Sequence, residues 1–436
     1  MLRSESETAV AAIDAVPIEP AASRETVRRT IVGTCAMLWY QGFTMAINGI
    51  GAPWIAKSFH LNESGIAWMY TWISLSAIGA LILSRFADRL GRRRVLLWCM
   101  VATPLCAFGA ALSLNRIVFT GFEIGLYAFI GATLSSSVVM LAEVLPIAER
   151  ANGQAYAGLA VALGGGLCVM LMPLLDQFGW SWRWLLALAT TGVFGVPFVS
   201  RVIPESARWE RAAASGATQQ ATIYDAFGPR YRARTIPVLL CCLVSTIAVN
   251  AATSWGYFHA VSVVGLSAGA ASVMMLTGGG VSLVGFRLGA WGAERFGRVP
   301  TVVLFSMLTA AGSVFFYWGP PAGFGSPGAW LGAGFCWFSL AVNAATVAGN
   351  SAATELFPTA LRGTMIGWFT FMTAVAAVSS QAAIALLADR LGGLSIVVGY
   401  LGLLAIPSAI MFGLFIEETR GMSLEVAARE DIAAIV

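Results

Sequence analysis

The chain has 436 residues, of which 58% are hydrophobic and only 11% are charged, and its formal net charge is +4. Soluble globular proteins average about 25% charged residues, so composition excludes a water-facing globular surface and indicates lipid as the solvent. The 47 glycines agree, because small residues let helices approach closely in membrane bundles. The seven cysteines lie inside apolar runs without metal-ligand or disulfide spacing, and we expect neither metal nor cofactor.

In chain order, the first segment is rich in Ala, Glu and Pro and lacks the pattern of a secretory signal, which predicts a disordered tail over 1–29. Twelve apolar runs follow, each long enough to cross a bilayer as an α-helix. The predicted spans are 31–54, 66–86, 95–113, 117–142, 153–174, 183–203, 236–258, 270–290, 299–318, 328–353, 364–387 and 393–416. The predicted fold class is an all-α membrane protein with twelve transmembrane helices.

One long polar segment, 204–235, divides the spans into six plus six. We expect a bundle of six helices on each side of this central loop, over 30–203 and 236–416, and a second tail over 417–436. Because the number of spans is even, both tails lie on one side of the membrane.

The basic residues indicate which side that is. Of the 26 Lys and Arg residues, 22 lie on the predicted side of the membrane that carries both tails. The four on the other side are Lys57, Arg116, Arg183 and Arg390. Positive charge is retained in the cytosol. The sequence therefore predicts an integral protein of the plasma (inner) membrane with both termini cytosolic.

The two halves repeat short charged segments. Asp88-Arg89-Leu90-Gly91-Arg92 recurs as 294–298, and Glu143-Val144-Leu145-Pro146 recurs as 355–358. Pro204-Glu205 ends the first half, and Glu417-Glu418 ends the second. Copies that keep the same orientation form a parallel repeat with an approximate two-fold axis along the membrane normal, and transporters built this way hold substrate between the halves.

Together these segments resemble the major facilitator superfamily, and in particular its sugar-porter and metabolite (aromatic acid)–proton symporter branches. The resemblance implies two six-helix bundles, alternating access and a cavity lined by helices one, four, seven and ten. The chain departs from the family pattern where Ser84 and Ala290 replace a glycine, and where Glu123 replaces the usual arginine of helix four. Helix five lacks the Gly-Pro pairing of drug antiporters, which favours symport.

Charged residues next to the helix ends form a candidate cytosolic gate. Carboxylate–guanidinium pairs there can hold the two halves together on that side and part when the cavity opens inward. The alternative is that these charges only anchor helix ends and fix topology. The gate residues are Asp88, Arg89, Arg92, Glu143, Arg150, Glu294, Arg295, Arg298, Glu355 and Arg362.

Glu123 is the one acid well inside a predicted span, and an ionisable group there indicates a function in proton coupling. The alternative is a place at the outer membrane surface, near Arg116. Polar and aromatic residues on the four cavity helices are candidates for substrate binding, or for contacts between helices. They are Gln41, Thr44, Asn48, Tyr127, Asn250, Trp255, Trp337 and Asn343.

Other classes of function fit less well. Gly265 to Gly269 matches a nucleophile pattern, but Ser267 precedes a predicted helix and is a good N-cap, so we expect no enzyme. Lys57 is the only lysine and lacks a phosphate-binding loop, so energy must come from a gradient.

We expect a monomer in the bilayer that imports a small organic acid with a proton and binds no nucleic acid. The alternatives are an exporter by proton antiport and a membrane sensor without transport.

Overall fold

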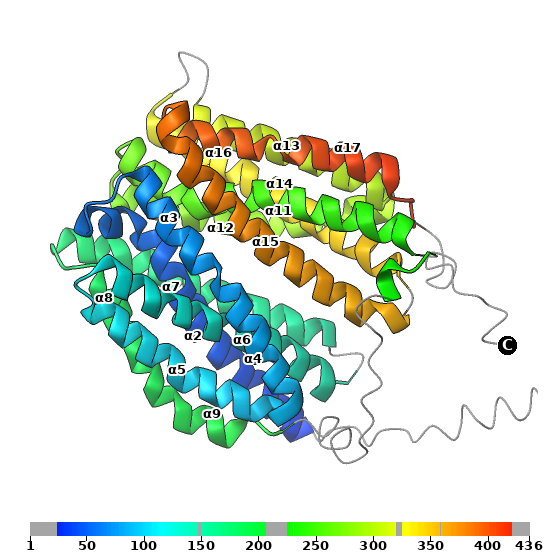
Figure 1. The fold of residues 1–436 in the computed structure, drawn as a ribbon, viewed down its shortest axis with the longest axis horizontal. Helices are drawn as coiled ribbons and strands as arrows, with labels where there is room; N and C mark the ends of the chain where they lie inside the picture. Colours follow the sequence, from blue (N-terminus) through cyan, green and yellow to red (C-terminus); the bar gives the residue numbers. More distant parts are fainter. Residues whose placement is uncertain are drawn as a thin grey trace, which may run out of the picture.

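The computed structural model describes residues 24–146, 150–205, 225–229, 231–319, 325–357 and 359–420. Within these ranges the chain forms helices and no strand, as expected from the sequence. Long helices run side by side in two bundles (Figure 1). The predicted tails over 1–23 and 421–436, and the centre of the loop over 204–235, lie outside the described residues.

Six predicted spans form the N-terminal bundle, in blue to green in Figure 1. Helices two and six are each divided into shorter pieces, and the remaining spans are single helices. The elements are α2 (Arg24–Ser58), α3 (Glu63–Ser74), α4 (Ser76–Leu90), α5 (Arg92–Leu112), α6 (Arg116–Val144), α7 (Arg150–Gln177), α8 (Arg183–Thr190), η2 (Thr191–Gly195) and α9 (Val196–Val202).

The other six spans form the C-terminal bundle, in green to red. A short turn precedes them, and spans seven and twelve each consist of two pieces. The elements are η3 (Asp225–Phe227), α11 (Arg232–Phe258), η4 (His259–Val263), α12 (Ala268–Arg295), α13 (Arg298–Trp318), α14 (Pro327–Glu355), α15 (Thr359–Leu391), α16 (Leu394–Gly402) and α17 (Ala405–Phe415).

Two boundaries differ from the prediction. The first helix begins at Arg24, so residues 24–29 are helical rather than part of a disordered tail, and Glu25 supports this turn by an ion pair with Arg29 one turn later (2.6 Å). Helix α11 begins at Arg232, inside the segment expected to be the central loop. Charged residues continue these helices beyond the apolar runs from which the boundaries were predicted.

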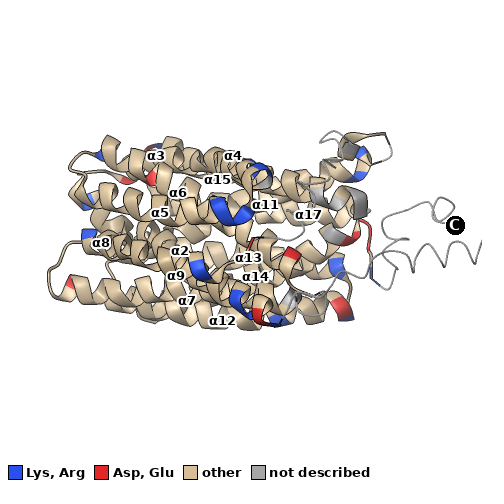
Figure 2. Cartoon of the chain, turned by 90° about the horizontal axis from the view of Figure 1, so that it is seen from below, with Lys and Arg blue, Asp and Glu red and all other residues tan. Residues whose placement is uncertain are grey.

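Eleven helical stretches among the described residues are long and apolar enough to span a membrane. The twelfth predicted span is α2, which has 35 residues but carries Thr30, Thr34, Gln41, Thr44 and Asn48 on its buried side. Figure 2 shows the helix bodies mostly in tan, with most charged residues toward helix ends. We call the end at which α2 begins and α17 finishes the tail side, and the other end the far side.

Glycines explain how closely some helices pack. A Cβ atom on Gly42 of α2 would lie 2.1 Å from the Val161 carbonyl oxygen of α7, and one on Gly164 would lie 1.9 Å from the Trp39 carbonyl oxygen. Helices α12 and α14 make the same kind of contact, at Gly285. Only a residue without a side chain permits such backbone contact, as is typical of membrane bundles.

The repeated loop segments form the same turn in both halves. Gly91 between α4 and α5 and Gly297 between α12 and α13 have φ values of 103° and 116°, which favour glycine. The helix that follows each turn is capped by an acid from the end of its own half. Glu205 accepts the Arg93 N–H (3.1 Å), and Glu418 accepts the N–H groups of Arg298 and Val299 (both 2.9 Å). The loop segment and the half-end acid therefore act as one structural unit.

Candidate functional site

A polar network lies inside the N-terminal bundle, where α2 meets α6. Gln41, Thr44 and Asn48 are all buried, which confirms that their spacing places them on one inward face of α2. The Asn48 side chain donates a hydrogen bond of 2.7 Å to Glu123 Oε2 on α6, and Gln41 donates one of 3.3 Å to Thr133 Oγ1.

Glu123 is 1% exposed and lies two turns beyond the first residue of α6. The structure thus places its side chain inside the bundle rather than on the bundle's surface. Its second carboxylate oxygen, Oε1, and the Asn48 Oδ1 atom have no hydrogen-bond partner among the described residues. A buried carboxylate with a single amide donor is costly to keep charged, which suits a group that gains and loses a proton.

Two tyrosines attach this network to the backbone of α2. The Tyr127 hydroxyl donates to the Met45 carbonyl oxygen (2.8 Å), and the Tyr70 hydroxyl donates to the Asn48 carbonyl oxygen (2.7 Å). Tyr127 was a predicted candidate, whereas Tyr70, on α3, was not. These bonds fix the position of the Asn48 backbone opposite Glu123.

A second polar network lies in the C-terminal bundle, between α11 and α15. The buried Trp255 indole donates to Gln381 Oε1 (2.9 Å). Ser380 and Gln381 both donate to Asn250 Oδ1, at 2.7 and 3.3 Å. Asn250 and Trp255 were predicted, and the structure joins them through two residues of α15.

The two networks meet where the bundles touch. The Tyr70 and Trp255 rings, one from each half, lie with centroids 5.4 Å apart and an interplanar angle of 48°. Tyr70 bonds to Asn48, which bonds to Glu123, while Trp255 bonds to Gln381. A continuous set of contacts therefore links the buried acid to the amides of the other half, and we call these residues the central cluster.

Two predicted residues lie outside the central cluster. Trp337 is 39% exposed, and its ring contacts Phe315 of α13 (5.9 Å). The Asn343 amide donates to the Ser339 carbonyl oxygen of its own helix (2.7 Å). Both lie on α14, and no interaction described in the structure joins either of them to Glu123 or Trp255.

The halves are joined by hydrogen bonds near the far side. Ser64 of α3 donates to the Ala385 carbonyl oxygen (2.6 Å), and the Leu394 N–H donates to the Glu63 carboxylate (2.5 Å). Ser272 of α12 donates to the Val169 carbonyl oxygen of α7 (2.8 Å). When the two repeated halves are exchanged, α3 corresponds to α12 and α15 corresponds to α7. The contact of α3 with α15 is therefore equivalent to that of α12 with α7. The far side is therefore closed by two related helix contacts.

A cavity of about 350 Å³ lies on the tail side of the central cluster, within the C-terminal bundle. Helices α11, α13, α14, α15 and α17 line it, with hydroxyl and amide groups among apolar side chains. The polar lining residues are Ser245, Thr246, Ser306, Thr309, Thr346, Asn350, Thr373 and Ser408.

The predicted gate residues form matching ion pairs on the tail side. Arg92 pairs with Glu143 (2.7 Å), and the equivalent Arg298 pairs with Glu355 (3.0 Å). Each pair joins two helices of the same half, so the expectation that such pairs join the two halves does not hold for these two. The side chains are less than 20% exposed, which lets each pair fix the ends of its helices.

The structure describes the side chains of three other gate candidates. Arg89, Glu294 and Arg295 are exposed. The side chains of Asp88, Arg150 and Arg362 lie outside the described part of the chain.

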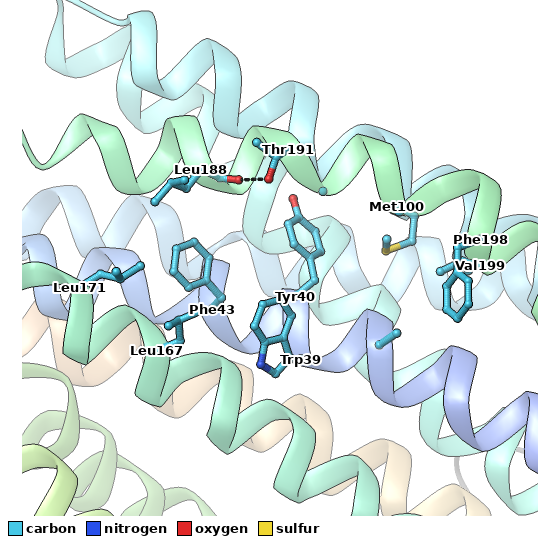
Figure 3. A pocket seen from close by; sticks show the side chains of 13 residues that line it. Trp39, Tyr40, Phe43, Met100, Leu167, Leu171, Leu188, Thr191, Phe198 and Val199 are labelled. Carbon is cyan, nitrogen blue, oxygen red and sulfur yellow. Dashed lines mark hydrogen bonds between the residues drawn. The ribbon is translucent and has the colours of Figure 1, made fainter.

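A further pocket, of about 450 Å³, opens on the side of the N-terminal bundle between α2, α7 and the α8–η2–α9 segment (Figure 3). Its lining is almost entirely apolar, and Trp39, Leu188 and Phe198 are exposed at its rim. Figure 3 shows the Tyr40 ring pointing across it toward Thr191. With so few polar groups, this groove suits lipid better than a polar solute.

Comparison with known proteins identifies the type of chain. The family model of the Major Facilitator Superfamily matches residues 34–381. The gentisate transporter of Corynebacterium glutamicum is 24% identical over 375 residues, covering 81% of this chain and 80% of that protein. The 3-(3-hydroxy-phenyl)propionate transporter of Escherichia coli is 27% identical over 247 residues, covering 54% of this chain and 58% of that protein.

Solved structures show the same fold. A D-xylose-proton symporter superimposes with a TM-score of 0.69 at 19% identity, covering 90% of this chain and 98% of that chain. A nucleoside transporter superimposes with a TM-score of 0.72 at 13% identity, covering 90% and 100%.

Proposed function

The chain belongs to the Major Facilitator Superfamily of membrane transporters, and we propose that it imports a hydroxylated aromatic acid, or a related organic acid, together with a proton. The observation that carries this proposal is the central cluster. It links a buried carboxyl group, two aromatic rings and three side-chain amides where the halves meet.

In this proposal Glu123 carries the coupling proton. In its neutral form the carboxylic acid is tolerated in the apolar bundle, and its proton is released when the site opens to the alkaline side. The Asn48 amide stabilises the charged form by a hydrogen bond, so both states of Glu123 are accessible. Gradient energy then enters transport through this one group.

The chemistry of the cluster suits an aromatic acid. Tyr70 and Trp255 are buried against each other in this state, so the proposal requires the cluster to open. Opening would expose the two ring faces to an aromatic substrate, and the side chains of Gln381, Asn250 and Ser380 to its hydroxyls and carboxylate. Relatives named for gentisate, gallate and 3-(3-hydroxy-phenyl)propionate support the same class of compound.

We propose that the tail side faces the cytosol, as the distribution of basic residues indicates. Closure of the far side by Glu63, Ser64 and Ser272 then corresponds to an inward-facing state. Import requires these bonds to break while the halves approach each other on the tail side.

Transport into sealed vesicles tests the proposal. Vesicles with an alkaline interior should accumulate gentisate or 3-(3-hydroxyphenyl)propionate, and Glu123→Gln should abolish this accumulation while sparing counterflow exchange. Asn343→Leu is the matched control, because the described hydrogen bond of the Asn343 amide is to its own helix. Undiminished accumulation by Glu123→Gln would overturn the coupling role. Gradient-driven extrusion would support the export alternative, and no flux of either acid would favour a sensor.

A further inference from the structure

Buried oxygens without a hydrogen-bond partner in the protein are unevenly distributed between the two halves. Among the described residues, the C-terminal half has one such side-chain oxygen, on Ser313. The N-terminal half has several on α2, α5 and α6, and most of their residues are fully buried. These residues are Thr34, Tyr40, Gln41, Asn48, Thr103, Glu123, Ser136, Ser137 and Glu143.

Most of these residues lie along the contact between α2 and α6. The helices run antiparallel, because Asn48 meets Glu123, Met45 meets Tyr127 and Gln41 meets Thr133. One turn further along, the same register places Ser137 of α6 opposite Met37 of α2. Ser137 is then at a height between those of Gln41 and Thr34. Continuing further brings Glu143 level with the buried Thr30.

The unpaired oxygens of α6 and those of Thr34, Gln41 and Asn48 on α2 therefore follow one line through the bundle. Its far end is Glu123, and its tail-side end is Glu143, which pairs with Arg92. Twenty residues of α6 separate the two acids, and at a rise of 1.5 Å per residue they are about 30 Å apart. We call this line the polar seam.

Buried polar groups in proteins nearly always bond to the protein or to ordered water. A buried water usually needs two to four polar partners, so several waters in a chain are needed to span the one to two helical turns between successive seam groups. Because these side chains are buried, the seam is separate from the open cavity on the tail side.

We propose that ordered water in the polar seam carries protons between Glu123 and the tail side, apart from the substrate route. The proton leaves the Glu123 carboxyl group for a neighbouring water, and each following water or hydroxyl accepts one proton and passes one on. The last water passes its proton to Glu143 Oε2, which releases it to water on the tail side, so one positive charge moves and no group is oxidised or reduced. This inference rests on the proposed proton coupling at Glu123.

Radiolytic hydroxyl labelling of the full-length protein in vesicles tests whether the seam holds water. Met37 and Met140 are fully buried on the two seam helices, and Met365, equally buried in the C-terminal half, is the matched control. Radicals form from bound water, so we expect Met37 and Met140 to become sulfoxides about fivefold faster than Met365. Equal rates at the three methionines would overturn the proposal, whichever acid the protein transports.

A flux measurement tests the proton path itself. The double variant Thr34→Val/Ser137→Ala removes two seam hydroxyls, and we expect it to slow gradient-driven gentisate accumulation about tenfold while counterflow changes less than twofold. Ser313→Ala removes an equally buried hydroxyl outside the seam and should behave as the wild type. Thermal unfolding checks that both variants are folded.

The outcomes separate this inference from the proposed function. A wild-type rate in the double variant would overturn the seam, while a loss of accumulation in Glu123→Gln would still support the coupling role. Unchanged accumulation in Glu123→Gln would overturn the coupling role and with it the seam as a proton path. The labelling rates report on hydration independently of both.

Discussion

At the scale of single residues, the environment of Glu123 decides the chemistry. Its carboxyl group has one described donor, Asn48, and its other oxygen has no partner within the described part of the chain. Asn48 is in turn held by Tyr70, which touches Trp255 of the other half. A change of charge on Glu123 can thus reach the interface between the halves through three direct contacts.

Replacing Asn48 tests the hydrogen bond to Glu123. Asn48→Leu removes the donor and leaves the buried carboxylate uncompensated, so we expect a loss of about 1–3 kcal/mol in the free energy of unfolding. Thermal unfolding in detergent measures it. In a Glu123→Gln background the same replacement should cost less, and an equal cost in both backgrounds would contradict a direct interaction.

Part of this site could be predicted from the sequence. The spacing of Gln41, Thr44 and Asn48 predicted that they share one buried face of their helix. Glu123 was selected because acidic residues are rare inside a membrane span. Its burial could not be settled, because the start of a helix predicted from hydropathy is uncertain by about two to four residues.

Other residues of the site were missed for an identifiable reason. Tyr70, Ser380 and Gln381 lie on helices two and eleven, outside the four helices expected to line the cavity. Ser380 and Gln381 are polar neighbours in an apolar run, and the rule applied to Glu123 would have selected them. The contact between Tyr70 and Trp255 depends on the relative orientation of the two halves, which cannot be predicted from a local sequence pattern.

At the scale of the helices, glycines that let two helix backbones touch determine how closely the helices of each bundle pack. Helices α2 and α7 touch at Gly42 and Gly164, and α12 and α14 touch at Gly285 and Gly289. The loop turns at Gly91 and Gly297 and their capping acids repeat in both halves. The sequence repeat therefore corresponds to a repeated structure, although the paired charges act within each half.

Two glycines of the same helix test this packing. Gly42→Ala would press its Cβ against the Val161 backbone, and we expect a loss of about 1–3 kcal/mol in stability from the forced shift. Gly49→Ala is the matched control, since nothing lies within 4 Å of its added Cβ. Thermal unfolding compares them, and an equal effect of the two replacements would argue against the close contact.

At the scale of the whole molecule, the structure is closed at one end. The contacts of α3 with α15 and of α7 with α12 join the halves on the far side, and the central cluster lies just beneath them. The cavity in the C-terminal bundle lies on the tail side. Alternating access then requires the halves to rock about the cluster, opening the far side while closing the tail side.

Distances between spin labels on the two halves test this central claim most directly. In a variant without the seven native cysteines, one label pair at Arg89 and Glu294 reports on the tail side, and another at Lys57 and Leu391 reports on the far side. We expect gentisate at acidic pH to shorten the tail-side distance and lengthen the far-side distance, and Glu123→Gln to remove the dependence on pH. Distances that stay fixed, or that change in the same direction on both sides, would contradict the account.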